Sequence, residues 1–246
     1  MHLTPTREPS RALDEEALAE RPLTPIDDAW LVIPLYNEAS VIQDVVRAAL
    51  TVFPHIVCVD DGSTDDSIEQ ARLGGATVLR HAVNLGQGAA LQTGIEYARN
   101  QPGARYLVTF DADGQHRVED AAAMVETARA DDLAIVFGSR FLDARTKPGL
   151  VKRVVLAMAV WFTNRSTGLK LTDAHNGLRV LRVDAARAVN LRQDRMAHAS
   201  EIVHQLGSSG LPWREYPVHI LYTDYSRAKG QSVWNSVNIL VDLIFK

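Results

Sequence analysis

The stretch "AWLVIPLYNEASVIQDVVRAALTVFPHIVCVDDGS", residues 29–63, holds two short apolar runs with one amphipathic segment between them. The run at 29–35 is continuously apolar and the run at 55–61 is apolar at 56–59, which is typical of strands buried on both faces. Within 38–50, apolar residues recur at helical spacing, namely Val41, Ile42, Val45, Val46 and Ala49. A strand, a helix and a second strand in this order predict a parallel βαβ unit.

The same alternation continues along the chain. Further strands are predicted at 76–81, 105–113 and 133–140, and further helices at 86–99 and 118–130. Strands that alternate with helices predict an α/β fold, with a Rossmann-like, mostly parallel central sheet flanked by helices. After the last of these strands the alternation loosens, so the second half of the chain is expected to be an addition to this Rossmann-like half.

The two ends of the chain differ in composition from the middle. Residues 1–27 are rich in Pro, Arg, Glu and Thr and have little to bury, which predicts a flexible N-terminal leader. Residues 28–246 are predicted to form a single domain. Its last segment, 232–246, predicts a C-terminal amphipathic helix, because five apolar residues share one helical face: Val233, Val237, Leu240, Val241 and Ile244.

Composition excludes several classes of protein. The formal net charge is −4, and nucleic-acid-binding proteins usually carry a basic excess, so no nucleic-acid partner is expected. The single cysteine, Cys58, lies in an apolar run, which predicts a core residue and excludes a disulfide within the chain. No signal peptide is evident, and no apolar run reaches the roughly 18–20 residues that span a bilayer. These features favour a cytoplasmic location.

Polar or glycine-rich sequence follows each predicted strand of the first half. In an open parallel sheet, ligands bind beyond the carboxyl ends of the strands, so these strand tips should meet at one edge. Asp60 at the second tip is predicted to contact ligand, and Gly86 at the third lies where a helix N-terminus favours an anion. Any single tip has the alternative of a helix cap or a tight turn.

The fourth tip carries Asp111 and Asp113, two carboxylates one residue apart. Unpaired carboxylates this close repel each other, and a divalent cation relieves the repulsion. Mg²⁺ and Mn²⁺ prefer oxygen ligands and are commonly completed by substrate phosphates, so we expect a metal that bridges protein to a diphosphate. Gln115 offers a further oxygen, whereas His116 is expected to be an exposed polar residue. A solvated turn is the alternative for the pair.

Taken in order, these motifs resemble the family-2 glycosyltransferases, which have the glycosyltransferase A fold, and in particular the dolichol- or polyprenol-phosphate sugar synthases. The resemblance covers about residues 29–235. The matching segments are "VIPLYNEASVI", "VDDGSTDDS", "NLGQGAALQTGI", "DADGQH", "FGSR", "LTDAHNGLRVLR", "REYPVHI" and "SRAKGQS". The resemblance implies that residues 28–246 form a single glycosyltransferase catalytic domain.

The resemblance also implies roles for individual residues. Asp111 and Asp113 would bind metal and donor, with Asp113 and Gln115 nearest the cation. Arg140 would lie near the transferred sugar or the acceptor, and Arg227 would close over the diphosphate. The remaining substrate-binding residues, of which the first four line the nucleoside pocket, would be Pro34, Tyr36, Glu38, Asp60, Asp61, Gly86 and Arg179.

The family implies transfer of a sugar, with inversion, from a UDP- or GDP-type donor to a lipid-linked acceptor in cell-surface glycan synthesis. A hydroxyl acceptor needs a general base, and Glu201 stands where the family carries an acid near the acceptor. Its alternative is a solvated helix residue. His175-Asn176, Val233 and Arg117 depart from the pattern of the phosphate-acceptor branch, so a soluble or protein acceptor stays open.

Residues 147–165 carry Lys and Arg around the apolar run "VVLAMAVWF". This segment and the C-terminal tail fit helices that lie on an anionic membrane surface, which would place the protein peripherally on the cytoplasmic face. Core packing and a contact between copies in a homo-oligomer are the alternatives.

Two other classes of nucleotide-binding enzyme would carry different motifs after the first strand. A nucleotidyltransferase would show a glycine- and arginine-rich loop after the first strand, and a NAD dehydrogenase would show G-x-G-x-x-G there. The sequence after residue 35 has neither. A non-catalytic sugar-nucleotide-binding protein is disfavoured by the intact Asp111, Asp113 and Arg227.

Overall fold

The computed structural model describes residues 24–142, 164–165, 169–174, 176–192 and 197–221. The strands are β1 (Ala29–Leu35), β2 (His55–Asp60), β3 (Thr77–Arg80), β4 (Tyr106–Thr109), β5 (Ile135–Ser139), β6 (Arg179–Arg182) and β7 (Trp213–Pro217). The helices are α2 (Ile42–Leu50), α3 (Ser67–Gly74), α4 (Gln87–Arg99), α5 (Val118–Ala130), α7 (Val183–Ala188) and α8 (Ala197–Ser208). The five strands and three helices predicted in the first half of the chain are confirmed.

One sheet with the strand order β3-β2-β1-β4-β6-β5-β7 forms the centre of the molecule. Every neighbouring pair is parallel except the two made by β6, which runs antiparallel to both β4 and β5. The prediction of a mostly parallel sheet is therefore confirmed. The sequence did not predict β6, because its four residues show neither a long apolar run nor a turn signal of their own.

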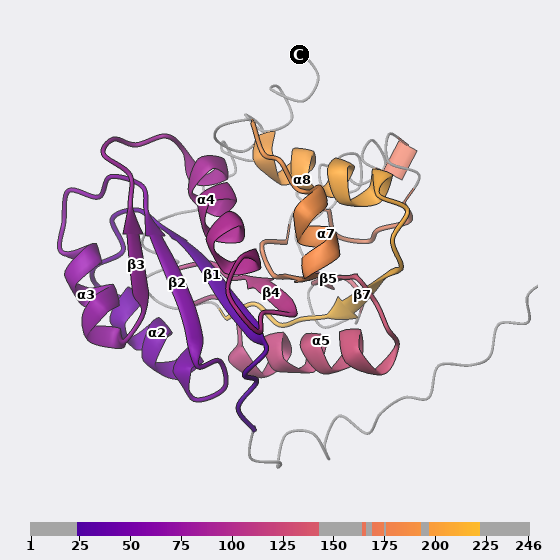
Figure 1. Cartoon of the computed structure of the whole chain (residues 1–246), viewed down its shortest axis with the longest axis horizontal. Helices are drawn as coiled ribbons and strands as arrows, with labels where there is room; N and C mark the ends of the chain where they lie inside the picture. Colours follow the sequence, from indigo (N-terminus) through magenta and orange to yellow (C-terminus); the bar gives the residue numbers. More distant parts are fainter. Residues whose placement is uncertain (1–23, 143–163, 166–168, 175, 193–196, 222–246) are drawn as a thin grey trace, which may run out of the picture.

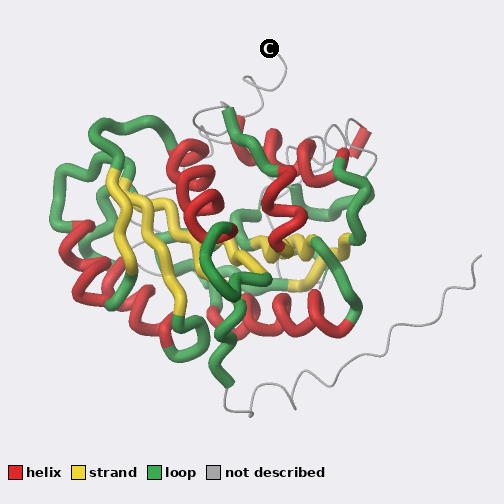
Figure 2. Tube along the Cα trace, in the orientation of Figure 1, coloured by secondary structure: helices red, strands yellow, loops and turns green. Residues whose placement is uncertain are grey.

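Helices cover both faces of the sheet (Figure 1). On one face, side chains of α2, α3 and α5 pack with β1, β2 and β4 in one apolar cluster. On the other face, α4, α7 and α8 pack on the sheet in a second cluster. Figure 2 shows the strands as a central layer between these two sets of helices. Cys58 is fully buried in the first cluster, as expected, and burial raises the pKa of its thiol to about 12.

The folded region begins before the boundary that composition suggested. Ile26, inside the predicted leader, is buried, and its N–H donates to the carbonyl of Val52 at 2.8 Å. Residues 1–23, the C-terminal helix, Arg227 and nearly all of 147–165 lie outside the described residues. Within the described ranges, no helix has the length and apolar character to cross a bilayer.

We predict that Gly94→Ala destabilises the protein, although alanine is the better helix former by about 1 kcal/mol. A Cβ on Gly94 in α4 would lie 2.4 Å from Val32 Cγ1 and 3.2 Å from Val59 Cγ2 on the sheet. Overpacking of this kind lowers the free energy of unfolding by about 1–3 kcal/mol, measurable by urea denaturation. Glu96→Ala, on the exposed side of the same helix, is the control and should change it little. A more stable Gly94→Ala protein would contradict this view of the contact.

Candidate active site

The first two strand tips are joined by hydrogen bonds between side chains and backbone. Asn37 adopts a left-handed conformation with φ of 54°. Its N–H donates to Ser63 Oγ at 2.9 Å, and its Oδ1 accepts from Thr64 N at 2.9 Å. The N–H of Glu38 donates to Ser67 Oγ at 2.7 Å. The side chain of Glu38 is buried next to Tyr36, which is exposed, and Pro34 lies in β1 just before this tip. These predicted nucleoside-pocket residues therefore share one rigid corner.

Asp61 joins the second tip to the third. Its Oδ1 accepts hydrogen bonds from Leu85 N at 2.9 Å and from His81 Nδ1 at 2.8 Å, and its Oδ2 accepts from Gly86 N at 2.7 Å. Gly86 has a φ of 97° and directly precedes α4. The carboxylate of Asp61 therefore binds protein groups, and it fixes the loop that opens α4.

Asp60, one residue earlier, is completely buried. Its carboxylate accepts from Ser63 N at 3.2 and 3.3 Å, and Arg80 Nε lies 3.9 Å from its Oδ2. Gly62 allows the second strand tip to lie close to the third. Its φ is +77°, and a Cβ on it would lie 2.9 Å from Asn84 N. A preformed acidic group thus lies beneath the second tip.

The Asp111 carboxylate at the fourth tip pairs with His116, whose Nε2 lies 2.9 Å from Asp111 Oδ2. The expectation that His116 is exposed was wrong. The residue is 6% exposed and packs edge-on against Phe110, with the ring centroids 5.3 Å apart. Burial alone would raise the pKa of Asp111. The charge and hydrogen bond of His116, and then the charges of Arg179 and His198, lower it by more than burial raises it, so the net shift is downward. The spacing of His116 after the two aspartates gave no signal of this contact.

Asp113 has the opposite shift. Burial and then the charge of Asp111 raise its pKa, with a smaller contribution from Glu38, while a hydrogen bond from Gln115 N to its Oδ1 at 3.0 Å lowers it. A raised pKa next to a second carboxylate is the mark of negative charge that lacks a counterion, and a divalent cation supplies one. The acidic pair therefore fits a metal.

The number of protein ligands is small. Among the described residues, no cluster of three or more His, Cys, Asp or Glu side chains is arranged to hold a metal ion. Gln115 contacts Asp113 through its backbone N–H. An ion bound by Asp111 and Asp113 would therefore need further oxygens from substrate or water, as Mg²⁺ sites that bind phosphates do.

The segment before β6 lies against Asp111. A Cβ on Gly177 would lie 2.4 and 2.7 Å from the two carboxylate oxygens of Asp111, so a larger residue there would displace the Asp111 side chain. Thr109 Oγ1, at the end of β4, donates to the carbonyl of Gly177 at 2.5 Å and fixes this approach. Arg179, 3% exposed, follows at the start of β6. Burial lowers its pKa to about 10, although the charges of Asp111 and Asp173 oppose this shift.

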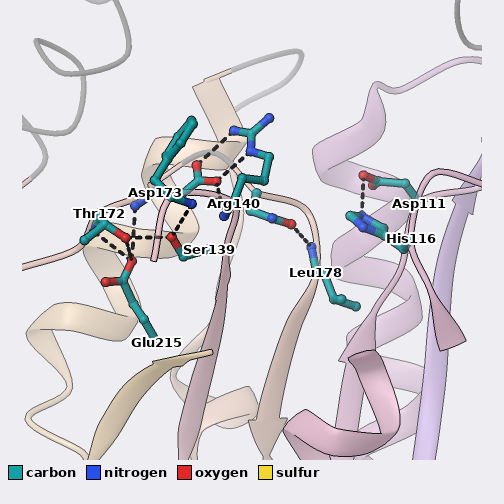
Figure 3. A network of polar contacts seen from close by, with 10 residues as sticks. Asp111, His116, Ser139, Arg140, Thr172, Asp173, Leu178 and Glu215 are labelled. Carbon is teal, nitrogen blue, oxygen red and sulfur yellow. Dashed lines mark hydrogen bonds and ion pairs between the residues drawn. The ribbon is translucent and has the colours of Figure 1, made fainter. Parts of the chain in front are cut away.

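Arg140 follows β5 and forms a two-pronged ion pair with Asp173. Its Nε and Nη2 lie 2.6 and 2.9 Å from the two carboxylate oxygens. The Asp173 side chain is 1% exposed and the Arg140 side chain 21% exposed. Figure 3 shows this pair on one side of Leu178 and the Asp111–His116 pair on the other. The antiparallel β6, which the sequence did not predict, therefore lies between the two strands, β4 and β5, whose tips carry these ionic pairs.

Glu201 lies on α8, as its helical pattern suggested, and its carboxylate accepts from the backbone N–H of Arg192 at 3.1 and 3.2 Å. Gln205 Nε2 lies 3.3 Å from its Oε1. His198, one turn earlier and buried, contributes to the field at Asp111, so the beginning of α8 faces the acidic pair. Arg227 lies outside the described residues.

The molecule has the glycosyltransferase A fold, in which a mostly parallel α/β sheet here carries an acidic pair at its carboxyl edge. The chain belongs to glycosyl transferase family 2, whose family model matches residues 30–189. It is therefore a glycosyltransferase, as the sequence predicted.

Two relatives and one solved structure illustrate this membership. The chain is 33% identical over 225 residues to an uncharacterised protein of Methanocaldococcus jannaschii, a match that covers 89% of this chain and 92% of the relative. It is 30% identical over 237 residues to the UDP-N-acetylglucosamine–dolichyl-phosphate N-acetylglucosaminyltransferase of Methanococcus voltae, with 87% and 94% covered. It resembles the structure of Mycobacterium tuberculosis glucosyl-3-phosphoglycerate synthase in complex with Mn²⁺ and UDP-glucose, with a TM-score of 0.60, 16% identity, and 94% and 80% covered.

We predict that Asp113→Asn makes the metal-free protein more stable at pH 7. The folded state raises the pKa of this carboxyl group. Above the unfolded pKa of about 3.9, ionisation therefore favours the unfolded state, and stability is lost as the pH rises through the folded pKa. Removal of the charge should raise the melting temperature by a few degrees in the presence of a chelator.

The gain should shrink as the pH falls below the unfolded pKa, because the carboxyl is then neutral in both states. Asp131→Asn, at an ion pair with Arg214, is the control and should show no such gain. An Asp113→Asn protein that melts at or below the wild-type temperature at pH 7 would contradict the prediction.

Proposed function

We propose that the protein transfers a sugar, with inversion, from a nucleoside diphosphate donor to a polyprenyl phosphate or other lipid-linked acceptor in cell-surface glycan synthesis. The observation that carries the proposal is the Asp111–Asp113 pair, which has unbalanced charge and too few protein ligands for a metal by itself. A diphosphate supplies the missing oxygens. The dolichyl-phosphate acceptor named for the Methanococcus voltae relative supports the lipid-linked acceptor.

The donor would bind across the first three strand tips. Pro34, Tyr36, Glu38 and Asp60 would line the nucleoside pocket, with the buried Asp60 carboxylate available to a base N–H or a ribose hydroxyl. Gly86, at the N-terminus of α4, would face the diphosphate, where backbone N–H groups and the helix dipole favour an anion. Asp61 would act by holding this loop in place.

Asp111, Asp113 and Gln115 would hold Mn²⁺ or Mg²⁺. The bound ion would supply charge that stabilises the leaving nucleoside diphosphate. Arg227 would add a cation to the same diphosphate. The Mn²⁺ in the Mycobacterium tuberculosis structure supports a divalent ion for this fold, and the ion of this chain is part of the proposal.

The acceptor would approach from the side of Arg140 and Arg179. Arg179 begins β6, where its charge acts on Asp111, and Arg140 follows β5, the next strand of the sheet. Both are cations that suit a phosphate. A phosphate acceptor is already an anion and needs no general base, whereas a hydroxyl acceptor does. Glu201 would serve a hydroxyl acceptor only after releasing the backbone of Arg192. We place the protein in the cytoplasm, peripherally at the inner face of the membrane, with self-association as a further possibility.

We predict that a UDP- or GDP-sugar with Mn²⁺ raises the melting temperature, because a ligand that binds only the folded state stabilises it. A donor at about 100 times its Kd contributes about 2.7 kcal/mol. A panel of UDP-, GDP- and dTDP-sugars, each with Mn²⁺, Mg²⁺ or a chelator, identifies base and metal together. Asp113→Asn should abolish the metal-dependent shift, and Asp131→Asn should retain it. If no sugar nucleotide in the panel raises the melting temperature of the wild-type protein, the donor assignment is refuted.

We also predict transfer from the identified donor to a short-chain polyprenyl phosphate in detergent. The matching prenol without phosphate should be a poor acceptor, because it offers Arg140 and Arg179 no anion. Product formation is followed by mass spectrometry, with Asp113→Asn as the inactive control and Asp131→Asn as the active one. Transfer to soluble hydroxyl acceptors but to no polyprenyl phosphate would refute the lipid-linked acceptor while leaving the donor site intact.

A further inference from the structure

Glu215, in β7, holds a turn that lies on the acceptor side of the sheet. It pairs with Phe137 of β5 in the parallel register of the two strands. Its Oε1 accepts three hydrogen bonds from this turn: from Thr172 N at 2.7 Å, Asp173 N at 3.1 Å and Thr172 Oγ1 at 3.1 Å. One carboxylate oxygen therefore binds two successive backbone N–H groups, and it fixes the direction in which the chain passes Asp173.

The turn at Thr172 and Asp173 also orients Arg140. Asp173, whose backbone Glu215 holds, directs both of its carboxylate oxygens at the Arg140 guanidinium (Figure 3). The backbone N–H of Arg140 also lies 3.2 Å from Asp173 Oδ2. A planar fork with two parallel hydrogen bonds loses its geometry when the carboxylate moves, because both bonds depend on the same orientation.

A second link ties the turn to the strand that carries Arg140. Ser139 Oγ lies 2.6 Å from Thr172 Oγ1 and accepts from Phe141 N at 3.2 Å. Ser139 is completely buried. Asp173, which binds the Arg140 side chain, belongs to the 172–173 turn, and Ser139, which precedes Arg140, contacts Thr172 of the same turn. Glu215 holds this turn.

The network places two carboxylates, Glu215 and Asp173, close together, and their burial and repulsion lower the stability of the folded state. Burial raises the pKa of Glu215 and the charge of Asp173 raises it further, while the N–H groups of Thr172 and Asp173 lower it. Two carboxylates meet at one turn, and Arg140 is the cation that one of them grips. A displacement of a functional group by about 1 Å can reduce a rate by up to about 100-fold. Fixing the position of the Arg140 cation is a functional reason to keep a network that lowers stability.

We propose that Glu215 is a positioning residue for the acceptor half of the site: it sets the turn at Thr172 and Asp173 so that Asp173 presents the Arg140 guanidinium to an anionic acceptor. The proposal rests on the proposed function for the identity of the acceptor. The contacts from Glu215 to Arg140 stand independently of it. Glu215 touches neither Asp111 nor Asp113 through any described hydrogen bond, so the donor half of the site should not depend on it.

Two substitutions separate hydrogen-bond geometry from charge. Glu215→Gln keeps the length of the side chain and an oxygen that accepts from both backbone N–H groups, but it removes the charge. Glu215→Asp keeps the charge, but it is one methylene shorter and withdraws the oxygen. We expect Glu215→Gln to retain kcat/KM for the polyprenyl phosphate to within about threefold, and Glu215→Asp and Glu215→Ala to lose roughly tenfold or more.

The affinity for the donor, measured by titration with the sugar nucleotide and metal, should stay within about twofold of wild type in all three variants. Asp28→Ala is the matched control, because Asp28 is also a partly buried carboxylate, but it pairs with Arg129 just before the first strand, at the end opposite to the site. It should lower the melting temperature without changing kcat/KM for the acceptor. Equal loss of donor affinity and acceptor kcat/KM in Glu215→Ala would show a general structural role and overturn the proposal.

A measurement without acceptor keeps the inference separate from the proposed function. In ¹⁵N-labelled protein, the Nε–H of Arg140 should exchange slowly in wild type and Glu215→Gln, and rapidly in Glu215→Asp and Glu215→Ala. Asp173→Asn assigns the signal by disturbing it directly. If wild type transfers to no polyprenyl phosphate, the proposed function fails while this signal still decides the role of Glu215. An Arg140 signal that is unchanged in both Glu215→Asp and Glu215→Ala would overturn the inference.

Discussion

The repulsion between Asp111 and Asp113 is the constraint on which the rest of the site depends. The charge of Asp111 raises the pKa of Asp113, and the surroundings shift the pKa values of the two carboxyl groups in opposite directions. His116, which is buried, lowers the pKa of Asp111, and Gly177 lies so close behind it that a larger residue would displace the Asp111 carboxylate. Asp113 is left with charge to neutralise. In the proposed function, a cation and a diphosphate would bind at these strand tips and neutralise that charge.

The two halves of the site are built by different means. On the donor side, short hydrogen bonds join neighbouring strand tips, and Asp61 holds the loop that opens α4. On the acceptor side, the antiparallel β6 brings a turn from far along the chain next to β5, and the pair of Arg140 and Asp173 forms there. The donor half thus follows from the regular βαβ pattern, while the acceptor half depends on the inserted segment.

Much of the first half could be predicted because its signals are local. Continuous apolar runs gave the strands, helical spacing gave α2, α4 and α5, and the rule for parallel sheets put the strand tips at one edge. The burial of His116 could not be predicted, because it depends on Phe110 and on the segment that pairs with it near Ile220. Asp61 looked like a ligand residue, yet its oxygens accept from backbone N–H groups more than twenty residues away.

The sequence by itself determined the family, the five strands β1 to β5 and the acidic pair, because each is encoded in residues close together in the chain. Only the tertiary structure decided which groups support that pair. Thr109 reaches Gly177 across 68 positions, and Glu215 reaches Asp173 across 42. Contacts over such separations depend on where β6 and β7 enter the sheet, and no local periodicity records that. The acceptor side of this glycosyltransferase is therefore a property of the fold more than of any one motif.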